Sequence, residues 1–457
     1  PGWAGSALAA IALWAAWMPV ETHPTAAVVV ALSLAVVAVA VRPAWPPPVV
    51  WATAFALVLS GLGGGDATRA VGQLALLAGV AVAWWLTSRA RPSRRNLELV
   101  AVGLCLLGAW GVVQALTAGP GSAADLGLVE PGAAGYVVER LQDGRAFASL
   151  LFPGHLAALL AMALALAASP ELFAQRRVLR VLCLGAAALG LLATRSPIGV
   201  ALGVGAVAVL LLARRSRLVL PVLLAGAVAG AAVLALRPDA RVLEPLRLRA
   251  QNWQTALWTF STAPVAGVGF GGYAQASQAV PLEVGNRPAH AHSLPLELLA
   301  ELGVAGLAAF VALAVLLLRL AVRLWPRSPG LAVAVVVMPL HNLVDFSLHV
   351  SGVAIPWAVL LGWATALARG TDAAAGPRTT PRMGVAVLGL TAAGLAAAVT
   401  LHQASRLLDA PARRSEGVID RQAAARLAHR LAPWRLDPGL LEAVAALDGG
   451  TDHDRRA

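Results

Sequence analysis

Residues 292–318 read HSLPLELLAELGVAGLAAFVALAVLLL, an apolar run typical of a membrane-spanning helix. From Leu294 to Leu318 only two side chains are charged, and a helix of that length can cross a hydrocarbon layer about 30 Å thick. Similar blocks of about 17 to 25 apolar residues recur along the chain, separated by short breaks that carry arginine, proline or glycine. We therefore predict an all-α, polytopic transmembrane helix bundle with about 12 to 13 spans.

The composition of the whole chain agrees with a membrane protein. Of its 457 residues, 59% are hydrophobic and 13% are charged, and the mean hydropathy is +0.74. A soluble domain carries about 25% charged residues, so we exclude a water-soluble enzyme. The net charge of +12 comes from 35 basic residues, all of them arginine. In so apolar a chain basic residues orient the spans and meet lipid phosphates, so nucleic-acid binding is not expected.

Hydropathy predicts thirteen spans and one orientation. The predicted spans are residues 2–19, 25–41, 48–64, 70–87, 97–117, 149–168, 178–194, 198–213, 218–236, 294–318, 330–350, 352–368 and 384–400. With a cytoplasmic N-terminus, the inner breaks carry 17 arginines and the outer breaks carry 9. The positive-inside rule selects this orientation.

Two long outer segments, 118–148 and 237–293, lead us to expect chemistry on the outer face, because every inner loop is short. We divide the chain into a transmembrane domain, 1–400, which includes these two loops, and a polar tail, 401–457. The tail is predicted to lie on the outer side and to be helical. It is either one unit of a helical-repeat domain or a mobile tail, since a lone repeat cannot bury its own face.

Ionisable side chains in or beside the apolar spans are candidate functional residues, because each costs several kcal/mol unless it is paired or hydrated. They are His155, Arg195, Glu297, Glu301, His341, Asp345 and His349. Those on the predicted spans 294–318 and 330–350 are spaced four apart, so each set shares one helix face. The two polar stripes are expected to face a common interior, where they serve either chemistry or helix-to-helix hydrogen bonding.

His292 is the best candidate for a proton acceptor. It directly precedes a predicted helix start, where Ser293 can cap the helix and Pro295 suits its first turn. Its imidazole is therefore expected at the outer interface rather than in lipid. There a histidine can be neutral at neutral pH and can accept a proton.

Two arginines are placed to meet a phosphate group. Arg195 lies in a short outer turn between two apolar spans. Arg249 begins a stretch whose apolar positions, 253, 256, 257 and 260, follow helical spacing, and its tryptophans are typical of a helix lying in the membrane interface. A guanidinium group offers phosphate a planar fork of donors. The alternative roles are snorkelling to lipid headgroups for Arg195 and interfacial anchoring for Arg249.

Three other patterns are given no chemical role. The run Gly267–Gly272 fits a dinucleotide-binding glycine spacing, but no predicted strand precedes it, so we interpret it as a tight turn. His290 and His292, two residues apart, would not converge on a metal from one helix face, so we expect no metal and no other cofactor. Cys105 and Cys183 both lie in predicted spans and form no disulfide framework.

These residues resemble the O-antigen ligase and O-antigen polymerase superfamily of bacterial cell-envelope membrane proteins. The family signature is a histidine, then Asn, Ser or Gln, nine residues and Gly-x-x-Gly. It stands here as His292-Ser293, nine residues and Gly303-Val-Ala-Gly306. Thr194-Arg195-Ser196, the stretch Arg249–Phe270 and the stretch His341–His349 resemble three more family features in the same order.

The resemblance implies a glycosyltransferase that needs no metal. It would move a glycan from a polyprenyl-diphosphate carrier to an acceptor hydroxyl, at the periplasmic face of the bacterial inner membrane. Family roles carried over here give three catalytic residues: Arg195 and Arg249 hold the donor diphosphate, and His292 activates the acceptor hydroxyl. The residues expected to bind substrate are Glu297, Glu301, His341, Asp345 and Trp253.

Several alternatives stay open at this point. Leu307 stands where ligases often have Gly, Thr or Tyr, so a polysaccharide polymerase and a protein O-oligosaccharyltransferase remain beside the ligase, with a lipid, a glycan or a protein as acceptor. A transporter or flippase is an alternative from a different class. It would place charge near the membrane midplane and show two related halves, whereas this chain has no internal repeat and gathers its arginines at the outer edge.

Overall fold

The computed structural model describes residues 2–17, 67–90, 92–117, 143–150, 152–169, 171–213, 221, 240–280 and 288–369, all of which belong to one compact unit. These residues form eleven α-helices and two short 3₁₀ helices, and they contain no strand. The predicted all-α membrane fold is confirmed. Apart from residue 221, four predicted spans and the tail lie outside the described residues. They are 25–41, 48–64, 218–236, 384–400 and 401–457.

Nine predicted spans coincide with helices. These are α1 (Gly2–Trp17), α4 (Ala67–Thr87), α5 (Arg94–Thr117), α8 (Pro153–Ala168), α9 (Arg177–Ala193), α10 (Pro197–Leu212), α14 (Leu294–Leu324), α15 (Pro329–His341) and α16 (Ser351–Arg369). Of the described helices, α5, α14 and α16 are long and apolar enough to cross a membrane, and most of the others are shorter apolar helices. The elements between α10 and α14 are α12 (Ala240–Thr262), α13 (Tyr273–Ala276) and the 3₁₀ helix η1 (Ser277–Ala279).

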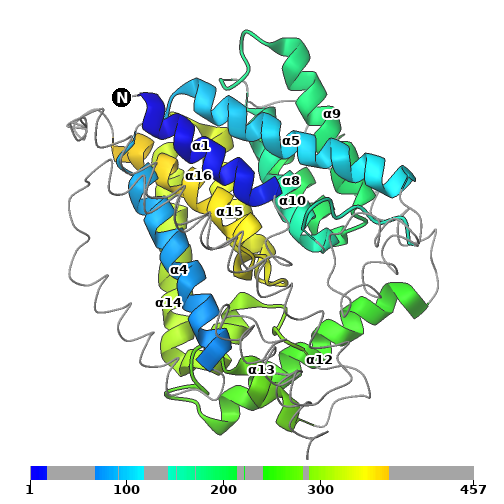
Figure 1. Ribbon diagram of the computed structural model, residues 1–457, viewed down its shortest axis with the longest axis vertical. Coiled ribbons are helices and arrows are strands. Elements are labelled where there is room, and N and C mark those ends of the chain that lie inside the picture. Colours follow the sequence, from blue (N-terminus) through cyan, green and yellow to red (C-terminus); the bar gives the residue numbers. More distant parts are fainter. Residues whose placement is uncertain are drawn as a thin grey trace, which may run out of the picture. The chain divides into compact units, whose positions relative to one another are not determined.

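Helix α8 lies at the core of the described bundle (Figure 1). It packs against α5, α9, α10 and α15, and all of its residues except Gly154 are buried. Its alanines and leucines let neighbouring helices approach on every side, since a helix that is apolar all round belongs in a core. Beside it, α5 and α9 nearly touch, because a Cβ added to Gly190 would lie 2.5 Å from the Cα of Gly108.

Helix α14 is broken at Gly303, which has φ 64° and ψ −155° inside the predicted span 294–318. A Cβ on Gly306 would collide with the carbonyl oxygen of Leu298. In a straight helix residues eight apart are separated by about 12 Å, so the two parts of α14 are not collinear. The part after the break, 304–324, is about 31 Å long and by itself matches the thickness of a bilayer.

A glycine-rich loop forms hydrogen bonds with the backbone of α14 on both sides of the break. The amides of Val268 and Gly269 donate to the carbonyls of Ala300 and Glu301, each at 3.0 Å, and the amide of Val304 donates to the carbonyl of Pro264 at 3.1 Å. These bonds satisfy backbone groups that the kink removes from the helix ladder. The loop needs glycine at 267, 269 and 271, all with positive φ, which confirms the predicted tight turn.

The predicted span 330–350 is wrong over its second half. Helix α15 ends at His341, and residues 342–350 form turns and the 3₁₀ helix η2 (Ser347–His349). After the helix, side-chain oxygens replace helical carbonyls as hydrogen-bond acceptors. Asn342 Oδ1 accepts from the amide of Leu348, and Asp345 Oδ1 accepts from the amide of Phe346. His341, Asp345 and His349 therefore do not form the predicted helical stripe.

The buried face of α12 also differs from the one predicted. A helix over residues 249–260 is confirmed, but Asn252, Thr255, Ala256 and Thr259 form its buried face. Of the four apolar positions expected to share a face, 253 and 260 are half-buried, 256 is buried and 257 is exposed. The helix packs against α14, so protein contacts rather than hydropathy alone select the buried face.

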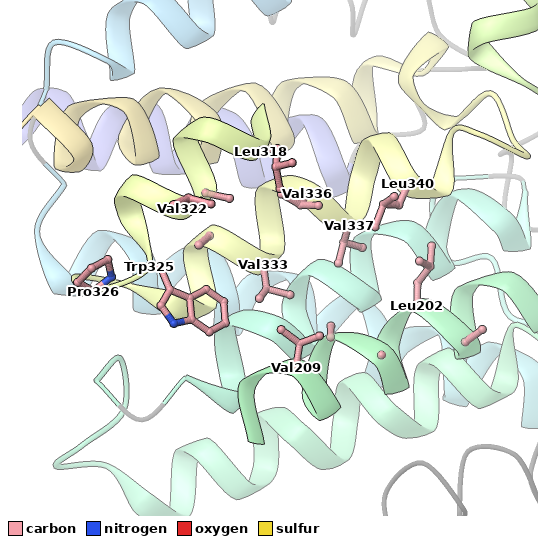
Figure 2. Close-up of a pocket in the computed structure, with 15 residues that line it drawn as sticks. Leu202, Val209, Leu318, Val322, Trp325, Pro326, Val333, Val336, Val337 and Leu340 are labelled. Atoms are coloured by element: carbon pink, nitrogen blue, oxygen red, sulfur yellow. The ribbon is translucent and has the colours of Figure 1, made fainter. Parts of the chain in front are cut away.

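An apolar pocket of about 620 Å³ lies among α10, α14 and α15. Figure 2 shows side chains from these three helices around it, including Leu202, Val209, Val322, Val333 and Leu340, together with Trp325 just after α14. None of the residues that line this pocket is ionisable. The polar candidates predicted from the sequence therefore lie elsewhere.

Candidate functional site

The polar candidates gather where α8 begins and α15 ends, around the carboxylate of Asp345. Its Oδ2 atom lies 3.9 Å from Nη2 of Arg249 and 3.9 Å from Nε2 of His341. A Cβ on Gly154 would lie 2.6 Å from the same oxygen, so glycine in the first turn of α8 makes room for the carboxylate. The positive end of the α8 dipole favours a negative charge there.

Asp345 is buried yet ionised. Burial by itself would raise the pKa of its carboxyl group, but His341 first, and then His155, Arg249 and His292, hold that pKa below its ordinary value. A buried carboxylate is stable only when cations and donors surround it. Asp345 thus supplies a fixed negative charge in the middle of the cluster.

The backbone of His292 is held in an uncommon conformation. Its φ is 53°, a left-handed value that a non-glycine residue rarely adopts and that costs about 1 to 3 kcal/mol. Two hydrogen bonds maintain it. Trp253 Nε1 donates to the carbonyl of His292 at 3.2 Å, and the amide of Leu294 donates to the carbonyl of Asn342 at 2.8 Å. Strain of this kind concentrates at functional sites.

The imidazole of His292 is neutral at physiological pH. Burial lowers its pKa to about 4, and the neighbouring charges of Arg249 and His290 act in the same direction, whereas Asp345 and Glu297 oppose them. Its Nδ1 atom is buried and has no hydrogen-bond partner among the described residues, so protonation there would create an unsatisfied donor. His292 is therefore a proton acceptor held in its unprotonated form.

Phe346 is the centre of an aromatic cluster that the sequence did not reveal. Its ring centroid lies 4.6 Å from the ring of His290 in a stacked arrangement, 4.6 Å from that of His292 and 4.9 Å from that of His155, both edge-on. Aromatic pairs at these separations favour one relative orientation. Phe346 therefore fixes the directions of three histidines that come from two separate parts of the chain.

Glu297 lies between two histidines. Its Oε1 atom is 2.8 Å from Nδ1 of His290 and 3.5 Å from Nε2 of His349. Its Oε2 atom accepts a hydrogen bond from the amide of Ala291 at 2.9 Å. The carboxylate thus joins the start of α14 and the loop directly before it to η2, which lies about fifty residues further along the chain.

Glu301 connects α14 to the loop and to α12. Its Oε1 atom accepts from the amide of Tyr273 at 3.2 Å, and the hydroxyl of Tyr273 donates to the carbonyl of Asn252 at 3.1 Å. Burial raises the pKa of the Tyr273 phenol, with further contributions from Glu297 and Glu301, so the phenol stays a donor. Tyr273 packs with Ala256, Ala291 and Ala300 in a small apolar core, and Leu296 packs against this core.

Arg195 lies in the short turn between α9 and α10, as predicted. It is exposed, its φ is 51°, and its Nη1 atom donates to the carbonyl of Asp143 at 2.5 Å. Within the described part of the chain it makes no ion pair with the cluster around Asp345. The start of α10 does pack near the start of α8, since a Cβ on Gly199 would collide with Ala157. Arg195 thus lies at the end of α10 that adjoins the site.

The structure brings together most of the side chains named from the sequence. Arg249, His292, His341 and Asp345 share one cluster, and Glu297 adjoins it. Trp253 and Glu301 contact backbone groups that shape the site, and their predicted substrate-binding role stays a prediction. Sequence reasoning missed Phe346, Gly154 and Tyr273. It named His349 as a candidate without a specific role, and it considered His290 only as a metal ligand, which it rejected.

The described residues form a helical membrane protein in which a half-buried histidine and arginine meet a buried aspartate at one end of the bundle. Residues 180–311 match the family described as O-Antigen ligase, and this match supports the resemblance to the O-antigen ligase and polymerase superfamily. The matched segment contains Arg195, Arg249, His292 and Glu297, and it ends before Asp345. No curated protein matches the chain. The family supports a general role in glycan transfer for this multi-pass membrane protein.

Proposed function

We propose that the protein is a membrane glycosyltransferase that moves a glycan from a polyprenyl-diphosphate carrier to an acceptor hydroxyl, as O-antigen ligases do, without a metal. We place the reaction at the periplasmic face of the bacterial inner membrane. The observation that carries the proposal is the cluster of a neutral, strained His292 with Arg249 and Asp345, in which His292 and Arg249 belong to the segment that matches the O-Antigen ligase family.

The arginines are assigned to the leaving group. When the bond between the anomeric carbon and the diphosphate oxygen breaks, negative charge grows on the diphosphate. Guanidinium groups fixed in a site of low dielectric stabilise that charge. Arg249 is held beside Asp345 at 3.9 Å, without a close bidentate pair, so its donors remain usable by a phosphate. Arg195, at the end of α10 that adjoins the site, is proposed as the second such group.

His292 is assigned to the acceptor. It takes the proton of the attacking hydroxyl while the hydroxyl oxygen forms the new bond to the anomeric carbon, and polyprenyl diphosphate leaves. Attack opposite the leaving group inverts the anomeric centre. A base with so low a pKa is unprotonated at neutral pH, but it binds the transferred proton only weakly. Asp345 raises the pKa of His292, and a bound diphosphate would raise it further by offsetting Arg249.

The test is glycan transfer by the purified protein from a polyprenyl-diphosphate glycan, with a chelator present and with lipid, glycan and peptide acceptors offered in turn. Loss of the general base in His292→Ala is expected to lower turnover by about 10²- to 10⁴-fold. Arg249→Ala and Arg195→Ala are expected to abolish transfer as well. Arg247→Ala is the matched control, because it removes an exposed arginine of the same helix and should leave transfer intact.

The three acceptors separate the members of the superfamily. Transfer to lipid identifies a ligase, transfer to a second glycan a polymerase, and transfer to peptide a protein O-oligosaccharyltransferase. Full activity in all three alanine variants, or a strict need for a divalent metal, would contradict the proposed scheme.

A further inference from the structure

Two histidines and one carboxylate outside the proposed reaction converge on a single point. The atoms are His290 Nδ1, Glu297 Oε1 and His349 Nε2, and all three lie within 4.8 Å of one another. Two of the separations are 2.8 and 3.5 Å. Donor atoms held about 2.0 to 2.2 Å from one ion are separated by such distances, so small side-chain rotations would bring all three into range of the same cation.

The surroundings of these three groups suit a metal site as well. The second oxygen of Glu297 is held by the amide of Ala291, and His290 is stacked on Phe346. Hydrogen bonds and packing contacts to the ligating side chains orient these side chains and raise the affinity for the metal. The histidine side chains are 19% and 13% exposed, which leaves a path by which an ion and a water ligand can enter.

We propose that His290, Glu297 and His349 form a binding site for a borderline divalent cation such as Zn²⁺, with a fourth position open to water. Two imidazoles and one carboxylate are the ligand set of many zinc sites. Imidazole nitrogen suits Zn²⁺, Co²⁺ and Ni²⁺, whereas Mg²⁺ and Ca²⁺ prefer oxygen alone. The site is distinct from the reaction proposed above, which uses no metal.

Occupation of the site is expected to inhibit glycan transfer, an expectation that rests on the proposed function. His292 follows directly after Ala291, whose amide holds Glu297. Rotation of Glu297 toward an ion would displace Ala291, and with it the backbone that positions His292. Binding itself does not depend on this expectation.

Metal binding is measured directly, on protein purified without a polyhistidine tag, stripped with a chelator and titrated with Co²⁺ and Zn²⁺. The wild type should bind one ion with a tetrahedral Co²⁺ absorption spectrum. In His349→Gln the affinity of this site for Co²⁺ should fall by at least about tenfold. The matched control is His341→Gln, which removes a buried histidine close to Asp345 but outside the three ligands, and which should bind Co²⁺ as the wild type does.

A second variant keeps the test decisive if glutamine at 349 disturbs folding. His349→Cys replaces one nitrogen ligand by a thiolate, so it should bind Co²⁺ and add a sulfur-to-metal charge-transfer band. The inference is overturned if the wild type shows no such binding component, or if His349→Gln, folded by circular dichroism, binds as tightly as the wild type. Inhibition of transfer by Zn²⁺ is read separately, and its absence with binding intact would count only against the inhibitory role.

Discussion

At the scale of single residues, the site depends on a histidine that burial keeps unprotonated. Two side chains named as catalytic from the sequence, His292 and Arg195, have positive φ values of 53° and 51°. Such backbone strain persists only where surrounding contacts impose it. For His292 these contacts are the indole of Trp253 and the ring of Phe346. The side chain is thus positioned by its neighbours rather than by its own preferences.

The low pKa of His292 predicts an unusual pH profile for kcat/KM. The base works only when neutral, and its pKa of about 4 lies below the ordinary value of 6.5. The rate should therefore stay flat from neutral pH down to about pH 5 and fall about tenfold per unit only below about pH 4. The measurement is the initial rate of transfer at subsaturating donor across this range.

Reversibility is the control for that profile. Protein held at the lowest pH and returned to neutral pH should regain its full rate, which excludes irreversible inactivation, and an unchanged circular dichroism spectrum at the lowest pH excludes reversible unfolding. An acidic limb centred near pH 6.5 would show that an ordinary, solvated histidine carries the reaction instead.

Residue identities were easier to predict from the sequence than their partners. The ionisable side chains were found because charge in an apolar chain is costly and conspicuous. Their pairing was not found, because the contacts of Asp345 come from α8, α12 and the end of α15. The role of Phe346 left no signal, since an aromatic residue in an apolar stretch is ordinary.

At the scale of elements, the glycines of the His-Ser-x₉-Gly-x-x-Gly signature act through the backbone. Gly303 lets α14 break, and the loop 264–269 takes up the exposed carbonyl and amide groups. The loop in turn leads back to α12, which carries Arg249. The break therefore fixes the distance between the arginine of one helix and the histidine that precedes the other.

Substitution Gly303→Ala is expected to disrupt this arrangement. Its Cβ would lie 2.6 Å from the carbonyl oxygen of Pro264 and closer still to that of Val265, at a backbone angle that alanine avoids. We expect a loss of about 2 kcal/mol or more in stability, together with loss of transfer. Thermal unfolding in detergent measures the first and the transfer assay measures the second.

Gly205→Ala is the matched control for that substitution. It also lies in an apolar helix, but no heavy atom lies within 4 Å of the added Cβ, so stability and transfer should be retained. Equal behaviour of the two variants would contradict the role given to Gly303.

Element boundaries could be predicted only where hydropathy governs them. Nine helices coincide with predicted spans, although α14 continues to Leu324 and α15 already ends at His341. The failures are the break at 303 and the end of α15 at His341, and both depend on polar backbone contacts within long apolar runs. Hydropathy does not register a glycine with positive φ or an asparagine that accepts a backbone amide.

At the scale of the whole molecule, the proposed reaction requires the site to face the periplasm. Val265, in the loop beside the site, is 77% exposed, and Pro326 is exposed just beyond the far end of α14. Because residues 304–324 match a bilayer in length, these two positions are expected on opposite sides of the membrane.

Cysteine labelling tests this orientation. Cys105 and Cys183, the two cysteines of the chain, are first replaced by alanine, and then Val265→Cys or Pro326→Cys is introduced. In spheroplasts a membrane-impermeant maleimide should label cysteine at 265, and it should label cysteine at 326 only after lysis. The reverse pattern would put the site in the cytoplasm and contradict the proposed localisation.

The junction between loop 264–269 and residues 300–304 limits how hybrid proteins could be made from this chain and its relatives. An exchange of the segment 294–324 alone would join a foreign break to a resident loop and would leave backbone groups without partners. The segment from Arg249 through Gly306 must therefore be exchanged as one piece. Hybrids with crossover points on either side of this segment should fold.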